Sequence, residues 1–251
     1  MRDRRPQPTD RKGLPVTPQA ADPATALDGS QARDLEQAWQ EVQPDAARRL
    51  LIAAVEAFAA RGFHATTTRD IAGGAGMSPA GLYVHYRSKE ELLHRITLIG
   101  HRHTLRLMGA ALAEAGTGAE AGTGAEAAAG APARTPAGRL RAVMGDLTAW
   151  HARHHTTTRV IEYELHSLSP EHRAEILLLR REVDGLVRQI LEDGVAQGAF
   201  AVPDVSTTAL ALLSLSVDVA RWYHEPARLA PEQLGRLYAD LALRMVGAEP
   251  S

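Results

Sequence analysis

The chain has 251 residues, of which 45% are hydrophobic and only 4% aromatic, and its formal net charge is −2. This length allows one large or two small domains with a core built mainly of Leu, Ala and Val, and the net charge excludes a protein that binds nucleic acid over its whole surface. The lack of cysteine excludes disulfides and thiolate metal sites and fits a reducing cytoplasm, and no run of about 18 apolar residues suggests a membrane span.

Residues 1–43 are rich in Pro, Gln, Asp and Ala and show no apolar periodicity. We expect this segment to be a disordered N-terminal tail. Its basic start, MRDRRPQPTDRKG, lacks the apolar stretch of a signal peptide. The expected location of the protein is therefore the cytoplasm.

Residues 44–92 are predicted to form three helices, of which the second and third are short. The first contains Leu51, Val55 and Phe58 at helical spacing on one face, and Gly62 is a natural end for it. Positive charge is concentrated in residues 44–108, which carry a net charge of +4, whereas the remaining chain carries −6. Such asymmetry indicates a polyanion as the partner of this part of the chain.

The second and third of these helices are separated by a glycine turn. Thr67 and Asp70 have the spacing of a capping box, which starts the second helix. Gly76 allows the left-handed turn that ends it, and Ser78 followed by Pro79 is a strong start for the third. Two helices with so short a connection indicate a helix-turn-helix.

Residues 93–248 are also predicted to be helical, so the fold class is all-α and no strand is expected. A long helix runs from Lys89 to about Glu114 and ends in a flexible Gly/Ala-rich loop at 115–136, where AGTGAE occurs twice in tandem. Apolar residues at helical spacing then predict further helices at 138–155, 156–168, 170–197, 206–224 and 231–247.

Residues 47–93 resemble the TetR family of bacterial transcriptional regulators. The resemblance rests on an apolar helix ending in Arg-Gly-Phe, on TTRDIA at 67–72, on AGMS at 75–78 and on LYVHYRSKEEL at 82–92. It implies an N-terminal three-helix DNA-binding domain, a C-terminal helical domain for ligand binding and dimerisation, and a homodimer that binds a palindromic operator in double-stranded DNA.

The short third helix is expected to enter the major groove, which is about 12 Å wide. Pro79, Ala80 and Gly81 present little bulk, which favours contact with thymine methyl groups and recognition of groove shape. The resemblance makes Arg69 the candidate for a bidentate contact with guanine, and phosphate contacts are expected from hydroxyl, imidazole and ammonium groups. The predicted DNA-binding residues are Thr67, Thr68, Arg69, Ser78, Pro79, Ala80, Gly81, Tyr83, His85 and Lys89.

The resemblance also implies a pocket for a small hydrophobic effector that releases the repressor from DNA. RWYHEP at 221–226 and MSPAGLYVHYRSKEELL at 77–93 look like a TetR subgroup that senses acyl-CoA thioesters. The helix at 206–224 is apolar nearly all round, which fits either a dimer contact, together with the last helix, or a buried core helix. The predicted ligand-binding residues are Met144, Leu147, Trp150, Leu179, Val183 and Trp222, with Arg180 (or Arg181 or Arg188) for the CoA phosphates; each apolar one could equally be plain core.

Three alternatives remain open at this stage. The same fold could sense an unrelated drug or metabolite, or it could bind DNA constitutively without an effector. His151, His154 and His155 have a spacing that would let two imidazoles share a metal, which leaves a metal-dependent helical enzyme as a third possibility. No nucleophile, phosphate-binding loop or cofactor signature accompanies these residues, so we expect neither enzyme activity nor a cofactor.

Overall fold

The computed structural model describes residues 39–117, 135–224 and 227–248, and within these ranges every regular element is helical. The prediction of an all-α fold is confirmed. No helix in the described ranges is long and apolar enough to cross a membrane. The elements are α2 (Asp45–Ala65), α3 (Thr68–Gly74), α4 (Pro79–His85), α5 (Lys89–Thr117), α6 (Pro136–Arg153), α7 (His155–Tyr163), the 3₁₀ turn η2 (Leu165–Ser167), α8 (Pro170–Ala196), α9 (Val205–Trp222) and α10 (Pro231–Met245).

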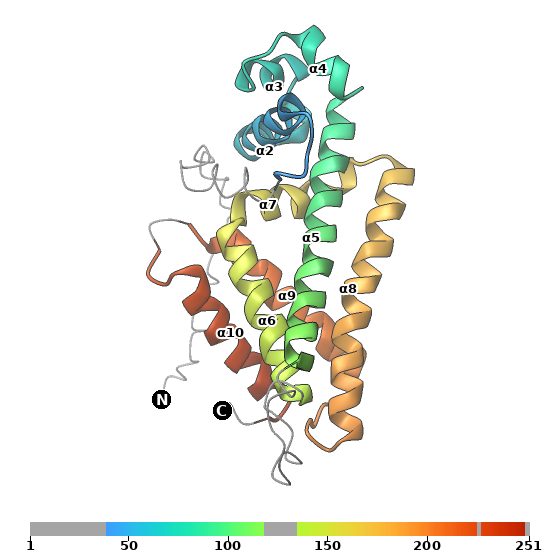
Figure 1. Cartoon of the computed structure of the whole chain (residues 1–251), viewed down its shortest axis with the longest axis vertical. Coiled ribbons are helices and arrows are strands. Elements are labelled where there is room, and N and C mark those ends of the chain that lie inside the picture. The colour runs from blue at the N-terminus through green and yellow to red at the C-terminus, as the bar shows by residue number, and fades with distance from the viewer. Residues whose placement is uncertain (1–38, 118–134, 225–226, 249–251) are drawn as a thin grey trace, which may run out of the picture.

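Helices α2, α3 and α4 lie together at one end of the molecule, and the long helix α5 connects them to a bundle of α6, α8, α9 and α10 (Figure 1). Two main clusters of buried apolar residues correspond to these parts. Leu92 and Ile96, near the start of α5, belong to the first cluster, whereas Met108 and Ala111 belong to the second. Because one rigid helix contributes to both clusters, a tilt of α5 moves the small end relative to the bundle.

The local signals around the helix-turn-helix act as predicted. The Thr67 hydroxyl accepts a hydrogen bond from the backbone N–H of Asp70, and the Asp70 carboxylate accepts one from that of Thr67, which completes a capping box. Gly76 has φ +68°, the left-handed conformation that a residue with a Cβ atom rarely adopts. The Ser78 hydroxyl accepts from Gly81 N–H at 3.1 Å, and Pro79 occupies the first turn of α4.

Helix α10 packs closely against α6. A Cβ atom at Gly235 would lie only 2.5 Å from the carbonyl oxygen of Gly145, so these two glycines allow the backbones to approach. An ion pair of 2.6 Å between Arg141 and Asp240 joins the same two helices. The last helix is therefore part of the bundle, and its opposite face is left toward solvent.

The structure changes one boundary of the predicted N-terminal tail. Trp39 is only 2% exposed and Val42 is also buried, and both pack into the first apolar cluster. The ordered domain thus begins before residue 44, because burial of a large aromatic side chain lowers the free energy of the folded state. The rest of the predicted tail, residues 1–38, and most of the predicted loop at 115–136 lie outside the described residues.

Candidate DNA-binding surface and effector cavity

Most of the predicted DNA-binding residues lie at the surface of α3 and α4. Arg69, on α3, is exposed, and so are the leading residues of α4, while Gly81 and His85 are partly buried. Tyr83 is 54% exposed, and its hydroxyl lies 3.2 Å from that of Thr68, so the two helices are joined by a polar contact at the surface. This surface presents small groups, hydroxyls and one guanidinium to a partner, which suits the edges and backbone of a duplex.

Thr67 has a capping role in this structure. Its hydroxyl donates to Asp70 Oδ2 at 2.7 Å, besides accepting from the backbone of the same residue. These hydrogen bonds from Thr67, with a smaller effect of nearby Arg61, lower the pKa of the Asp70 carboxyl. Because the hydroxyl hydrogen is already donated, Thr67 positions α3 and has no hydrogen left for a phosphate.

Lys89 occupies a different position from the one expected. Its Nζ lies 2.7 Å from the carbonyl oxygen of Phe63, 3.2 Å from that of His64 and 2.8 Å from that of Thr66. These carbonyls are at the end of α2, where helical carbonyls lack partners and attract a cation. An ammonium group has three N–H donors. All three are used here, so the geometry does not support the expected phosphate contact.

One residue on this surface was missed by the sequence analysis. Val84 is 79% exposed and lies four residues after Ala80, so the two share a face of α4. A valine exposed to this degree is not explained by core packing. The helical spacing of Ala80 and Val84 was the available signal, and an apolar stripe of this kind matches the methyl groups of thymine.

Two carboxylates connect the small N-terminal domain to the bundle. Glu164, which directly follows α7, accepts a hydrogen bond of 3.0 Å from the backbone N–H of Phe63 at the end of α2. Glu90, in the first turn of α5, accepts one of 2.8 Å from the backbone N–H of Ser169, which caps α8, and its Oε1 lies 2.9 Å from His172 Nδ1. Two side-chain hydrogen bonds thus join α7 and the start of α8 to α2 and α5, the helices next to α3 and α4.

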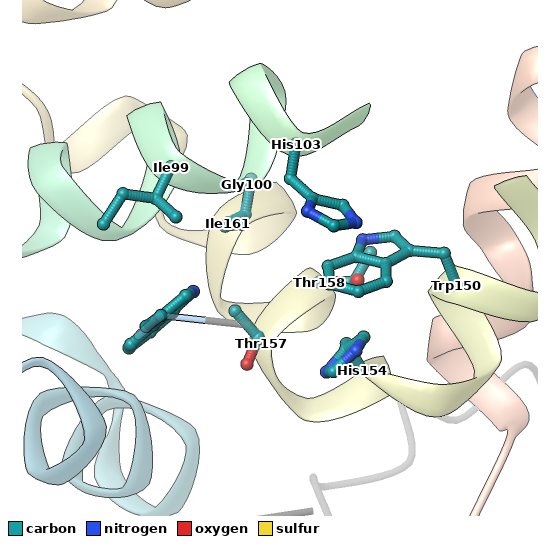
Figure 2. Close-up of a pocket in the computed structure, with 9 residues that line it drawn as sticks. Ile99, Gly100, His103, Trp150, His154, Thr157, Thr158 and Ile161 are labelled. Atoms are coloured by element: carbon teal, nitrogen blue, oxygen red, sulfur yellow. The ribbon is translucent and has the colours of Figure 1, made fainter. Parts of the chain in front are cut away.

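A small cavity of about 20 Å³ lies between α5, α6 and α7 (Figure 2). It has room for about one water-sized group. Its walls come from four parts of the chain, including the segment before α2. The residues are Trp39, Ile99, Gly100, His103, Trp150, His154, Thr157, Thr158 and Ile161.

Aromatic rings form one wall of this cavity. The ring of Trp150 is stacked on His103, with a centroid distance of 3.7 Å, and lies at the same centroid distance from His154 on the other side. Burial lowers the pKa of His103, and burial followed by nearby positive charge lowers that of His154 to about 3. Both imidazoles are therefore neutral at pH 7.

Of the predicted ligand-binding residues, only Trp150 lines the cavity. Met144 and Leu147 are buried in the second apolar cluster, Val183 packs against that cluster and Leu179 against the first. They serve as core because their helices pack on each other in the bundle, away from the cavity.

Two further residues predicted for the effector site lie away from the cavity. Trp222 is 45% exposed rather than enclosed in a tunnel, because it lies at the end of α9 on its outer side. Arg180 donates to Glu162 at 2.6 Å and to His101 at 3.1 Å, so its guanidinium is already paired and is not directed at an incoming phosphate.

The histidines considered as metal ligands point to separate partners. His151 Nδ1 lies 3.0 Å from the carbonyl oxygen of Ser216, and His155 Nδ1 lies 2.9 Å from that of Ala152. In the described part of the chain no three side chains of the metal-binding types are placed to hold one ion. The carboxylates nearby are engaged as well, Glu162 by Arg180 and Glu164 by Phe63.

Comparison with known proteins identifies the family. Residues 45–96 match the family model described as bacterial regulatory proteins, tetR family, and residues 133–246 match the model of the tetracyclin repressor-like C-terminal domain. A bacterial regulatory protein in the tetR family from Rhodococcus RHA1 is 38% identical with a TM-score of 0.71, over 83% of this chain and all of that one. The chain belongs to the TetR family.

Two further TetR proteins help to place it. The HTH-type transcriptional repressor KstR2 of Mycolicibacterium smegmatis is 29% identical over 80% of this chain and 91% of its own. The structure of AibR in complex with isovaleryl coenzyme A and operator DNA matches 78% of this chain and 97% of that one, with a TM-score of 0.64. At 23% identity, this similarity is one of fold. The relatives of this TetR protein are transcriptional regulators, and no enzyme family is indicated.

Proposed function

We propose that this TetR protein is a cytoplasmic, homodimeric repressor that binds a palindromic operator and leaves it when a hydrophobic effector enters the cavity between α5, α6 and α7. The observation that carries the proposal is the hydrogen bond from Phe63 N–H to Glu164. It joins the end of a cavity-lining helix, α7, to α2 of the DNA-binding domain. An effector that displaces α7 therefore acts on the position of α3 and α4.

Recognition of DNA is assigned to α4 with support from α3. The slim start of α4 lets the backbone approach the base edges, and Ala80 and Val84 present methyl groups to thymine. Arg69 supplies a guanidinium for guanine, while Tyr83 and His85 contact phosphates. These contacts remain predictions, and the exposure of Arg69 and Tyr83 supports them.

Dimerisation is assigned to α9 and α10. Leu237, Leu241 and Met245 follow one another at intervals of four residues on α10 and are each about 40% or more exposed. Leu210 and Leu215 add exposed apolar side chains on α9. Apolar surface of this extent favours a protein partner, and a second copy of the chain is the partner that a palindromic operator requires.

For the effector we propose an acyl-CoA thioester, on the basis of the subgroup resemblance at 77–93 and 221–226 and of the similarity to the repressor KstR2. A cavity of about 20 Å³ is far too small for such a molecule. Binding must therefore open the space between α5, α6 and α7, and that displacement is what would move the DNA-binding domain. The ligand changes the equilibrium only to the extent that it prefers the open state.

The proposal can be tested in two steps. An operator is first selected from a library of inverted-repeat duplexes, and DNA binding is then measured by fluorescence anisotropy with increasing acyl-CoA of several chain lengths. We expect one inverted repeat to be preferred over random DNA and at least one thioester to weaken its binding about tenfold or more. A protein with no preference among duplexes is not a repressor of this kind, and one with a preference but no response to any thioester senses another effector.

A further inference from the structure

The cavity has two polar atoms without hydrogen-bond partners. Nδ1 of His154 and Oγ1 of Thr157 are both buried and unpaired, and the two residues are only 5% and 6% exposed. His154 is the N-cap of α7 and Thr157 lies in the first turn of that helix, so the two residues are close along the chain. Both residues line the cavity, and in Figure 2 they lie below the ring of Trp150.

Such atoms are unusual in a folded protein. Most buried polar atoms have a partner, and an unpaired one destabilises the fold. A few other buried side-chain atoms are unpaired in the described residues, including Oγ1 of Thr148 on α6. Only His154 and Thr157, however, combine this state with a place on the cavity wall. Two unpaired groups on residues that line one void can both be satisfied by a single polar group bound in that void.

The electrostatics of the cavity restrict the group that fits there. Its lining contains no Lys, Arg, Asp or Glu. The pKa of His154 is lowered to about 3, first by burial, so its imidazole brings no positive charge at pH 7. A carboxylate or phosphate would be buried without compensation, which is strongly unfavourable. An uncharged oxygen carries no such penalty.

Size and hydrogen bonding agree with this restriction. The void of about 20 Å³ accepts one small polar group before the helices separate. A threonine hydroxyl donates or accepts, and a neutral imidazole nitrogen does one or the other according to its tautomer. A carbonyl or hydroxyl oxygen can therefore satisfy both atoms at once, while the side chains of Ile99 and Ile161 provide an apolar surface for the adjoining carbon atoms.

We infer that Thr157 and His154 bind an uncharged carbonyl or hydroxyl oxygen of the effector, and that at this position the contact selects a carbonyl or hydroxyl group over a hydrocarbon or carboxylate group. The inference deepens the proposed function and rests on its effector site. In an acyl-CoA the oxygen would be that of the thioester carbonyl. The acyl chain would then occupy the space opened between α5 and α7, and the charged nucleotide would stay outside.

The experiment uses matched probes and the full-length protein. Binding is measured by isothermal titration calorimetry in a buffer that contains cosolvent and no detergent. The probes are octanoyl-CoA, octyl-CoA (the thioether that lacks the carbonyl oxygen), 2-decanone, decane and octanoate. The variants are Thr157→Val and His154→Phe. Thr148→Val is the control, because the hydroxyl of Thr148 is also buried and unpaired but does not line the cavity. Melting temperature without ligand is recorded for each, and Thr157→Val is expected to stay folded because it removes an unpaired polar atom.

We expect the wild type and Thr148→Val to bind the thioester about tenfold more tightly than the thioether, and the ketone more tightly than the alkane or octanoate. This preference should vanish in Thr157→Val and in His154→Phe. Equal binding of thioester and thioether by the wild type overturns the inference and leaves the acyl-CoA proposal standing. Binding of the ketone alone, lost in Thr157→Val, supports the inference and overturns acyl-CoA as effector. No binding of any probe overturns both.

Discussion

Nζ of Lys89 lies 2.7 Å from the carbonyl oxygen of Phe63 and 4.4 Å from the centre of its ring. The first residue of α5 thus holds the end of α2 by a charge-assisted hydrogen bond and by attraction between a cation and an aromatic ring. Glu164 accepts a hydrogen bond from the N–H of the same Phe63. Three elements of the chain therefore meet at one residue, where the DNA-binding domain joins the bundle.

Replacement of Lys89 by alanine should destabilise the protein rather than alter its contact with phosphate. We expect the free energy of unfolding to fall by about 2–3 kcal/mol, because three carbonyls at the end of α2 lose a charged donor. Urea denaturation measures this change. Arg87→Ala, at an exposed neighbouring position, is the control and should unfold like the wild type.

The same Lys89 variant separates two roles. A phosphate contact would reduce the slope of log K against log salt by about one unit, whereas a structural contact leaves the slope unchanged. A protein of normal stability with a reduced slope would mean that Lys89 leaves α2 and contacts DNA in the complex.

Replacement of Arg69 by alanine should relax the sequence preference at one base pair of the operator. Loss of a bidentate contact with guanine reduces discrimination there by about 1–3 kcal/mol, while affinity for random duplex changes less. Competition between the selected operator and its single-base variants measures the effect. A uniform loss of affinity for all duplexes would instead assign Arg69 to the phosphate backbone.

Glu164→Ala should weaken the coupling between effector and DNA. Such coupling is typically about 1–3 kcal/mol, and we expect this variant to lose at least half of it because α7 no longer holds Phe63 N–H. The measurement is the ratio of operator affinities with and without effector. Glu164→Gln keeps an acceptor oxygen and should behave like the wild type, so equal coupling in the alanine variant would remove this hydrogen bond from the mechanism.

Acid should destabilise the protein through buried histidine. The pKa of His154 is lowered from 6.5 to about 3 by burial, and that of His151 to about 4 for the same first reason. Between these values and pH 6.5 the unfolded chain binds protons that the folded chain does not, so stability present above pH 6.5 is lost as the pH falls. His154 alone should account for about 2 kcal/mol between pH 7 and pH 5.

The variant His154→Phe isolates this contribution. Its free energy of unfolding should depend less steeply on pH from 6.5 down to about 5 than that of the wild type, as measured by denaturant titrations at a series of pH values. Parallel curves for the two proteins would show that His154 is protonated in the folded state and that its site is not apolar.

Leu241→Glu should convert the dimer to a monomer. The side chain is 39% exposed on α10, and a buried, unpaired carboxylate in the middle of an apolar contact is strongly unfavourable. Sedimentation velocity at micromolar concentration measures the change, and operator affinity should fall with it. Leu178→Glu, at a 55% exposed position on α8, is the matched control and should remain dimeric. A dimeric Leu241→Glu protein would place the interface elsewhere.

The residues of the helix-turn-helix could be located from the sequence because their signals are local. Thr67 with Asp70, Gly76, and Ser78 with Gly81 each act within three residues along the chain, so their geometry depends little on the rest of the fold. The all-α class followed for the same reason, since apolar spacing decides which segments are helical.

The cavity proposed as the effector site could not be located in this way. Trp150, Thr157 and Trp39 come together only when α5, α6 and α7 pack against the segment before α2, and nothing in their local sequence distinguishes them from core residues such as Met144. Lys89 illustrates the same limit, because its partners lie 23 to 26 residues earlier in the chain.

The sequence by itself thus determined the helices and the family, and it predicted the surface proposed to face DNA, because all three depend on spacing within a few residues. Only the tertiary structure decided which polar groups are left unpaired beside a cavity, which charged groups are already engaged, and which carboxylate joins α7 to α2. Each of these properties depends on which binding partners the packing of the helices places within reach of a side chain. They exist only once distant segments are in contact.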